Sequence, residues 1–215
     1  MSTKSFFDGY AADFDSIYGD GVFDRKRNAF EKITDKLFRK AMRMRFDYVG
    51  DSIKALTPNS SVLDAGCGGG VYLHFLQNKE QSLNYTGFDF AQNMIDLAKT
   101  RAERLRIEDN TSFELADIDS FSSDKKFDLV IGMGFFDYMK NAEEALSKLC
   151  SLSADKVIIS LPKADHWLAL QRKVRYRLRG CDLFLYSTEQ RDVLLKKCNH
   201  KITDGERDWI VEIKV

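Results

Sequence analysis

A glycine-rich turn is the stretch of this sequence with the clearest chemical potential. Asp64, Gly66, Gly68 and Gly70 form the pattern D-x-G-x-G-x-G within "LDAGCGGGVY", between an apolar run and a helical one. Glycine permits a tight turn and lets a ligand approach the backbone without a Cβ in the way. The amides at the start of a helix favour a negative group. The turn therefore predicts a ligand site between a strand and a helix.

Two further aspartates stand at the expected ends of the next two strands. Asp89 ends the run "NYTGFD", where a carboxylate can accept hydrogen bonds from both hydroxyls of a ribose. Asp117 ends the run "TSFELAD", where it could accept a hydrogen bond from an adenine amino group. Together with Asp64, these acids predict a nucleoside site at one edge of a sheet. The alternative is that each acid caps the helix that follows it.

The elements that would position these residues alternate between strand and helix patterns. The run "FDLVIGM" is almost continuously apolar, as expected for a strand that is covered on both faces. The alternation predicts an α/β fold with a Rossmann-like, doubly wound and mostly parallel sheet. The runs "HKITD" and "DWIVEIKV", joined by "DGER", predict a C-terminal hairpin with an antiparallel strand. Seven strands are expected, at 61–65, 84–89, 111–117, 127–133, 156–161, 200–204 and 208–215.

A helical cap is expected before the sheet. Apolar residues recur near a helical period over 30–56, and the turn residues "TPNSS" then interrupt the pattern. We therefore expect an N-terminal helical cap over residues 1–56 and a core over residues 57–215. The core should carry a basic helical insertion at 163–187, and the following "STEQ" has the spacing of a capping box.

The motifs together resemble those of the class I S-adenosylmethionine-dependent methyltransferases. NAD-binding proteins usually carry G-x-G-x-x-G, which is a different spacing. The strings "VLDAGCGGG", "YTGFD" and "FDLVIGMGFFDYM" carry the resemblance over roughly residues 61–161, and the terminal hairpin agrees with that family's sheet. The resemblance implies S-adenosylmethionine as the cofactor. The implied contacts are with its methionine and ribose side (Asp64, Ala65, Gly66, Cys67, Gly68, Gly70), its ribose hydroxyls (Asp89), its adenine (Phe90, Met94, Asp117, Ile118) and its methionine moiety (Met133).

A narrower resemblance is to the magnesium-protoporphyrin O-methyltransferases. It rests on "FDGYAADFDSIYGDG" and "RKAMRMRFDYV" near the N-terminus and on "SLPKADHWLALQRKVRYRLRGCDLFLYS" in the later region. Tyr18 falls where that family has a Tyr beside the donor and the acceptor. Asp137 falls where it has a His, and this departure concerns the porphyrin substrate and not the architecture.

Methyl transfer is an in-line displacement at a sulfonium carbon, so the protein mainly positions the reactants and excludes water. A neutral hydroxyl acceptor also needs a base within hydrogen-bond reach, whereas a carboxylate acceptor does not. His166 follows the fifth expected strand and is a candidate base; the alternative is a surface histidine at the start of the inserted helix. Asp137 and Tyr138 follow the fourth strand and could orient the acceptor, or could be a capping Asp and a packed Tyr. His74 is expected in the core.

The charged residues are balanced overall but unevenly placed. The chain has 33 Lys and Arg and 33 Asp and Glu, so no global field recruits nucleic acid or a membrane. Two segments, 25–45 and 163–180, are nevertheless rich in basic residues. If both line one pocket, the acceptor should be anionic; the alternative is two solvated helix faces. The helix within 164–179 pairs an apolar stripe with a row of arginines, so it could be a lid, a membrane-touching helix or a packed helix with solvated arginines.

The remaining features narrow the function class. The N-terminus lacks the apolar region of a secretory signal, no apolar stretch is long enough to span a bilayer, and the four cysteines lack metal-ligand spacing. We expect a cytoplasmic small-molecule O-methyltransferase without a metal, acting on an acidic, phosphorylated or lipid- or glycan-linked acceptor; the oligomeric state stays open. One alternative is an RNA methyltransferase, but "GMGFFDYM" lacks the D/N-P-P-Y and Pro-Cys signatures of such enzymes. Another is a non-catalytic nucleoside-binding protein, against which the intact glycines and acids argue.

Overall fold

A seven-stranded sheet forms the centre of the protein. The computed structural model describes residues 29–78, 81–166, 169–178 and 180–215. The strand order is β3-β2-β1-β4-β5-β7-β6, and β7 runs opposite to all the other strands, so that it pairs antiparallel with β5 and with β6. The expected doubly wound, Rossmann-like sheet with an antiparallel C-terminal hairpin is therefore confirmed. The strands are β1 Ser61–Ala65, β2 Asn84–Asp89, β3 Thr111–Leu115, β4 Phe127–Gly132, β5 Ser153–Pro162, β6 Asn199–Asp204 and β7 Asp208–Lys214.

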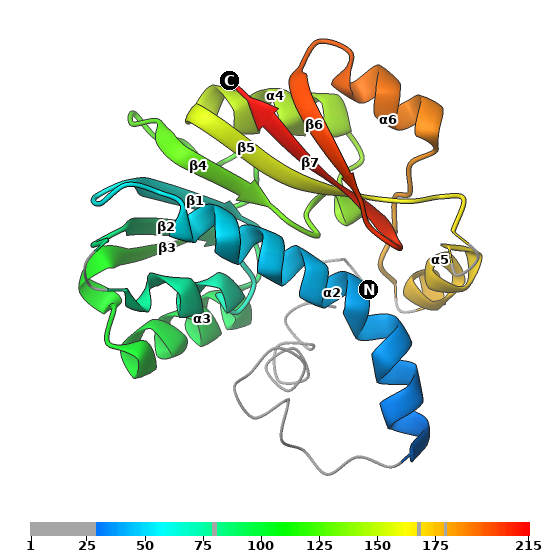
Figure 1. The fold of residues 1–215 in the computed structure, drawn as a ribbon, viewed down its shortest axis with the longest axis horizontal. Helices are drawn as coiled ribbons and strands as arrows, with labels where there is room; N and C mark the ends of the chain where they lie inside the picture. Colours follow the sequence, from blue (N-terminus) through cyan, green and yellow to red (C-terminus); the bar gives the residue numbers. More distant parts are fainter. Residues whose placement is uncertain (1–28, 79–80, 167–168, 179) are drawn as a thin grey trace.

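Helices cover both faces of this sheet (Figure 1). In the described part of the expected cap, one long helix, α2 (Ala29–Lys54), crosses the sheet and continues beyond its edge. The other helices follow the alternation expected from the sequence. They are η1 Val71–Gln77, α3 Gln92–Leu105, η2 Glu108–Asn110, η3 Phe136–Tyr138, α4 Ala142–Leu152, α5 Ala169–Leu178 and α6 Thr188–Leu195. The predicted capping box of α6 is present, with Ser187 and Gln190 bonding each other's backbone.

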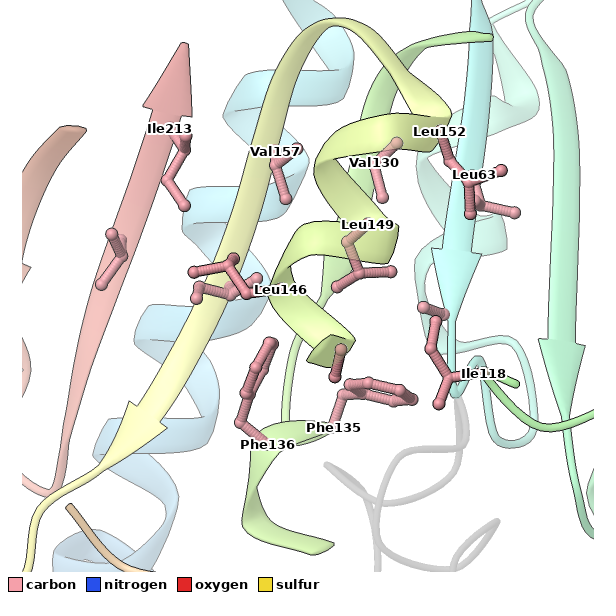
Figure 2. Close-up of a cluster of buried hydrophobic side chains, with 14 of the residues drawn as sticks. Leu63, Ile118, Val130, Phe135, Phe136, Leu146, Leu149, Leu152, Val157 and Ile213 are labelled. Atoms are coloured by element: carbon pink, nitrogen blue, oxygen red, sulfur yellow. The ribbon is translucent and has the colours of Figure 1, made fainter. Parts of the chain in front are cut away.

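The central strands are buried on both faces because their side chains alternate between two apolar layers. In β4, Val130 packs into the layer beneath α4, whereas Leu129 and Ile131 pack into the layer beneath α2 and η1. A strand's two-residue period makes this division automatic. Figure 2 shows the first layer, in which Leu146 and Leu149 of α4 lie against the strands. The two layers hold β1 and β4 rigidly, and the loops that follow these strands carry the site.

Two local expectations need correction. The segment after the glycine-rich turn is a 3-10 helix, and His74 is exposed on it, so the expectation of a core histidine was wrong. With three residues per turn, Leu73 and Leu76 share the buried side, while His74 falls on another side. The third strand ends at Leu115, so Asp117 lies two residues beyond the strand and not at its end.

The basic insertion leaves the sheet and returns to it at one place. Lys163 and Tyr186 form a parallel bridge, and backbone hydrogen bonds join Ala164 to Tyr186 and Tyr186 to Pro162. Between these points the chain forms α5, which lies at the periphery of the molecule in Figure 1. The insertion is therefore a closed excursion from the carboxyl end of β5, beside the edge of the sheet where parallel strands present ligands.

Candidate donor and acceptor site

A cavity of about 580 Å³ opens at the carboxyl edge of the sheet. Its walls come from the loops after β1, β2, β3 and β4 and from α2, α5 and the start of β7. The strands β1 and β4 lie side by side in the sheet. The next strands are added on opposite sides of this pair, β2 beside β1 and β5 beside β4, so the strand order reverses between β1 and β4. Such a switch point leaves a crevice between the loops, which is where ligands bind in open α/β sheets.

Three of the four glycines in the turn have left-handed backbone conformations but different structural roles. Gly66, Gly68 and Gly70 all have positive φ, at 68°, 51° and 70°, which other residues rarely adopt. Gly66 and Gly68 line the cavity. Gly70 does not, and a Cβ there would meet Leu73 Cδ1 at 2.6 Å. The first two positions therefore expose backbone to the cavity, while the third allows close packing of the following helix.

Asp89 joins this turn to the end of β2. Its Oδ2 accepts a hydrogen bond from the Gly68 N–H at 3.0 Å, and its Oδ1 accepts one from the Ala91 N–H at 2.9 Å. The side chain is buried and lines the cavity. These two bonds hold the carboxylate of Asp89 beside the turn, at the wall of the cavity.

Two buried groups support the turn from behind. Asp64 accepts a hydrogen bond from the Tyr85 hydroxyl at 2.6 Å, and burial raises the pKa of Asp64 to about 7. Arg101 of α3 donates a hydrogen bond to the carbonyl of Gly69. Sequence reasoning missed Arg101, although it shares the buried face of α3 with Met94 and Ala98, where an arginine is unusual.

The predicted cofactor residues mostly lie on the cavity wall. Those that line it are Gly66, Cys67, Gly68, Asp89, Phe90, Met94, Asp117, Ile118 and Met133. Asp64, Ala65 and Gly70 belong to the supporting structure instead. Asp117 is exposed, and hydrogen bonds from Ser120 to its Oδ1 lower its pKa. Asp117 is therefore held in its ionised form at the rim of the cavity.

A cluster of two arginines and two aspartates closes the other end of the cavity. Arg172 of α5 pairs with Asp137 of η3 at 3.0 Å, and Arg45 of α2 pairs with Asp208 of β7 at 2.6 Å. Arg172 also lies 4.0 Å from Asp208. Each of these side chains lines the cavity, and each comes from a different element. We call these four residues the charge cluster. The sequence drew attention to Asp137, and the two arginines lie in the basic segments 25–45 and 163–180, but nothing in the sequence singled out Asp208.

Asp137 is the most constrained member of the charge cluster. The residue is only 3% exposed, and burial raises the pKa of the Asp137 carboxyl against the opposing effect of Arg45 and Arg172. Its Oδ2 accepts from Arg172, but its Oδ1 has no hydrogen-bond partner within the part of the chain that the structure describes. A buried carboxylate oxygen without a partner is costly, so this atom is suited to accept a hydrogen bond from a ligand.

The remaining candidates for catalysis are placed differently. Tyr138 lines the cavity, and burial raises its pKa well above the usual value, so its hydroxyl stays protonated. His166 is half-buried, and desolvation together with nearby cations, Arg207 first, lowers its pKa. It is not among the residues that line the cavity. Tyr18 lies outside the described residues.

Comparison with known proteins identifies the family. A family model described as "Methyltransferase domain" matches residues 56–212, which is most of the chain. The chain belongs to this family of methyltransferase domains. The expectation of a class I S-adenosylmethionine-dependent methyltransferase is thereby confirmed.

Individual relatives of this methyltransferase are distant. A probable (S)-tetrahydroprotoberberine N-methyltransferase 2 from Papaver bracteatum is 27% identical over 106 residues, covering 49% of this chain and 29% of that protein. A malonyl-[acyl-carrier protein] O-methyltransferase from Bacillus cereus is 28% identical over 104 residues, covering 48% and 37%. The aligned parts thus span about a third of these relatives. The crystal structure of magnesium protoporphyrin IX methyltransferase from Synechocystis PCC 6803 with bound SAH (S-adenosylhomocysteine) is similar in fold, with a TM-score of 0.74. It is 21% identical in sequence, and the match covers 98% of this chain and 97% of that one.

The cavity of this methyltransferase fits the donor that its family uses, S-adenosylmethionine. Gly66 and Gly68 present backbone to the cavity, and the carboxylate of Asp89, a group that can accept hydrogen bonds from hydroxyls, lies on the same wall. Phe90, Met94 and Ile118 provide an apolar wall of the kind an adenine needs.

Among the described helices, none is both long and apolar enough to cross a membrane.

Proposed function

We propose that this protein transfers the methyl group of S-adenosylmethionine to an oxygen of a small acidic acceptor, such as a carboxylated, phosphorylated or lipid- or glycan-linked molecule. The observation that carries this proposal is the division of one cavity into two chemically different ends. The glycine-rich turn and Asp89 line one end, and the charge cluster lines the other. Both ends share the loop after β4, so donor and acceptor would meet there.

The donor supplies a methyl group that is activated by attachment to a sulfonium. In our proposal, the backbone at Gly66 and Gly68 and the carboxylate of Asp89 hold its methionine and ribose. Met133 and Gly134, which line the cavity after β4, border the reacting carbon. The chain's contribution is then to fix the in-line geometry and exclude water, which are the main requirements of this displacement.

The arginines of the charge cluster support an anionic acceptor. A guanidinium has five N–H groups, and the hydrogen bond from Arg172 to Asp137 uses one of them. Arg45 and Arg207 line the same region of the cavity. Planar guanidinium groups match carboxylate and phosphate oxygens, so an acidic acceptor can bind beside the carboxylates of the cluster.

Asp137 supplies a base when the acceptor is a hydroxyl. Its unpartnered Oδ1 is the atom that would accept the proton of the hydroxyl, and its raised pKa brings the carboxyl nearer to the range where it works as a base. A carboxylate acceptor would need no base, and Asp137 would then only orient it. Tyr138, which stays protonated, would donate a hydrogen bond to the acceptor in either case.

Transfer of labelled methyl from S-adenosylmethionine tests this proposal. The purified protein is incubated with the acidic and neutral fractions of a metabolite extract and, separately, with total RNA. We expect label in the acidic fraction, and we expect Asp89→Ala to abolish it. Mild alkali then separates the two acidic classes, because it releases the label of a carboxylate methyl ester and leaves that of an ether.

Three outcomes contradict the proposal. Label in RNA alone would assign the protein to nucleic acid. Label in the neutral fraction alone would remove the acidic acceptor. Tight binding of the donor without transfer to any fraction would favour a nucleoside-binding protein on the same fold.

A further inference from the structure

The helix α5 presents an apolar face to solvent. Leu170 is 74% exposed, Val174 is 50% exposed and Leu178 is 83% exposed. Residues four apart lie on one face of a helix, so these three side chains form a continuous stripe along the ten residues of α5. We call this set the α5 stripe. An outward apolar stripe of this kind usually marks a contact surface.

The opposite face of α5 explains why the α5 stripe points outward. Ala169 is buried, Arg172 is bound in the charge cluster, and Tyr176 lines the cavity. These residues follow each other at intervals of three and four, so they form the inner face of the helix. The ion pair of Arg172 with Asp137 therefore fixes the rotation of α5 and leaves Leu170, Val174 and Leu178 uncovered. Arg172 is therefore not a solvated arginine, whereas Arg177 on the same helix is exposed.

Cations flank the α5 stripe. Lys173 and Arg177 are exposed beside it, and α5 contains no acidic residue. A second copy of the chain is a poor occupant, because a two-fold contact would bring these cations against their own copies. The headgroups of an anionic bilayer pair with such cations, while the apolar side chains enter the boundary of the acyl chains.

We infer that α5 docks the protein on an anionic lipid surface, with the α5 stripe inserted and Lys173 and Arg177 at the headgroups. In Figure 1, α5 lies at the edge of the molecule, where a flat surface can reach it. The inner face of the same helix lines the acceptor end of the cavity. An acceptor with an anionic group and an apolar body would therefore pass from the lipid surface to the charge cluster along α5. The identity of this acceptor rests on the proposed function, whereas the lipid contact does not.

Sedimentation of the full chain with vesicles tests the lipid contact. The vesicles contain phosphatidylcholine alone or with about 30% phosphatidylglycerol, which makes them anionic. Because Lys173 and Arg177 each interact favourably with an anionic surface, we expect at least about tenfold stronger binding to the anionic vesicles. Replacing Leu170→Ser together with Leu178→Ser should weaken that binding by about tenfold or more, because both side chains lose their burial in lipid. Replacing Lys173→Glu together with Arg177→Glu should remove the preference for anionic vesicles.

Matched controls separate α5 from the general surface. Val193→Ser removes a similarly exposed apolar side chain from α6, and Lys196→Glu with Lys197→Glu reverses two exposed cations elsewhere. These variants should sediment like the unchanged protein. Calorimetric binding of S-adenosylhomocysteine should be equal in every variant, which shows that the fold and the donor site are intact whether or not lipid binds.

Two results would overturn the inference. One is equal vesicle binding by the unchanged protein and the Leu170→Ser, Leu178→Ser variant. The other is the absence of vesicle binding by the full chain. If analytical ultracentrifugation then shows a dimer that the same double variant abolishes, the α5 stripe is a contact between two copies of the chain and not a lipid contact. Neither result affects the test of methyl transfer, so failure of the lipid contact is distinguishable from failure of the proposed function.

Discussion

Asp89 links the glycine-rich turn to the segment after β2, because one of its oxygens accepts a hydrogen bond from the Gly68 N–H and the other accepts one from the Ala91 N–H. Asp89→Ala should weaken S-adenosylhomocysteine binding by about tenfold to a hundredfold per lost ribose bond, since a hydrogen bond to a charged group contributes about 1.5–3 kcal/mol. Isothermal calorimetry measures this effect. Asp124→Ala, which removes an exposed carboxylate outside the cavity wall, is the control and should bind normally. Unchanged binding by Asp89→Ala would refute the donor site.

Gly68 combines a cavity-facing position with a φ of 51°. Gly68→Val should abolish binding of S-adenosylhomocysteine, because a branched side chain disfavours this backbone conformation and occupies the donor's approach. Circular dichroism and calorimetry on the same sample check that the protein stays folded while binding is lost. A variant that folds and binds like the unchanged protein would mean that the donor does not approach this turn.

Asp64 gives the protein a distinctive pH dependence. Burial raises its pKa from 3.8 to about 7, so the folded state binds a proton that the unfolded state has released. Stability contributed by this group is therefore present at low pH and falls as the pH rises from about 4 to about 7. In Asp64→Asn, which keeps an acceptor for the Tyr85 hydroxyl, that part of the slope should disappear. Urea midpoints across this pH range decide the point, and an identical slope in both proteins would contradict it.

At the scale of the elements, α3 supports the donor site although it lines the cavity chiefly through Met94. Arg101→Met should leave the carbonyl of Gly69 without its donor and weaken S-adenosylhomocysteine binding by about tenfold, the usual effect of stranding a buried polar group. Arg104→Met on the exposed side of α3 is the matched control. Calorimetry measures S-adenosylhomocysteine binding by both variants. Equal weakening of binding in the two variants would mean that α3 affects the donor site only through the general stability of the fold.

The elements were largely predictable because their signals are local. The apolar run of β4 and the hairpin turn before β7 each lie within a few residues, and both appear where the sequence indicates. The 3-10 form of η1 was not predictable, because it depends on packing against α2 and α3. The hydrogen bonds between Ser120 and Asp117 were not predictable either, because the sequence pattern of a strand does not show at which residue the strand stops pairing with its neighbour.

The charge cluster was beyond sequence reasoning for a different reason. Arg45 and Asp208 are far apart in the sequence, and only the packing of α2 against the assembled sheet brings their side chains to 2.6 Å. The basic segments were correctly noticed, but their arginines at the cavity are paired with carboxylates and are not solvated faces. Reversing Arg172 to Glu would therefore place three acids together and disturb the fold, so milder substitutions are needed to examine its role.

At the scale of the whole molecule, the charge cluster ties the cap, the insertion and the C-terminal hairpin around one cavity. Arg172→Met should destabilise the protein by about 3–5 kcal/mol, because the buried carboxylate of Asp137 loses the cation that is hydrogen-bonded to it. The double variant Arg172→Met, Asp137→Leu should recover most of that loss, since no buried charge of the pair remains.

The exposed pair of Lys214 and Asp155 provides the comparison, and its double-mutant cycle should give a coupling energy of less than about 1 kcal/mol. Urea unfolding of the four proteins in each cycle measures both coupling energies. A coupling between Arg172 and Asp137 no larger than that of the exposed pair would mean that the cluster does not hold these three parts together.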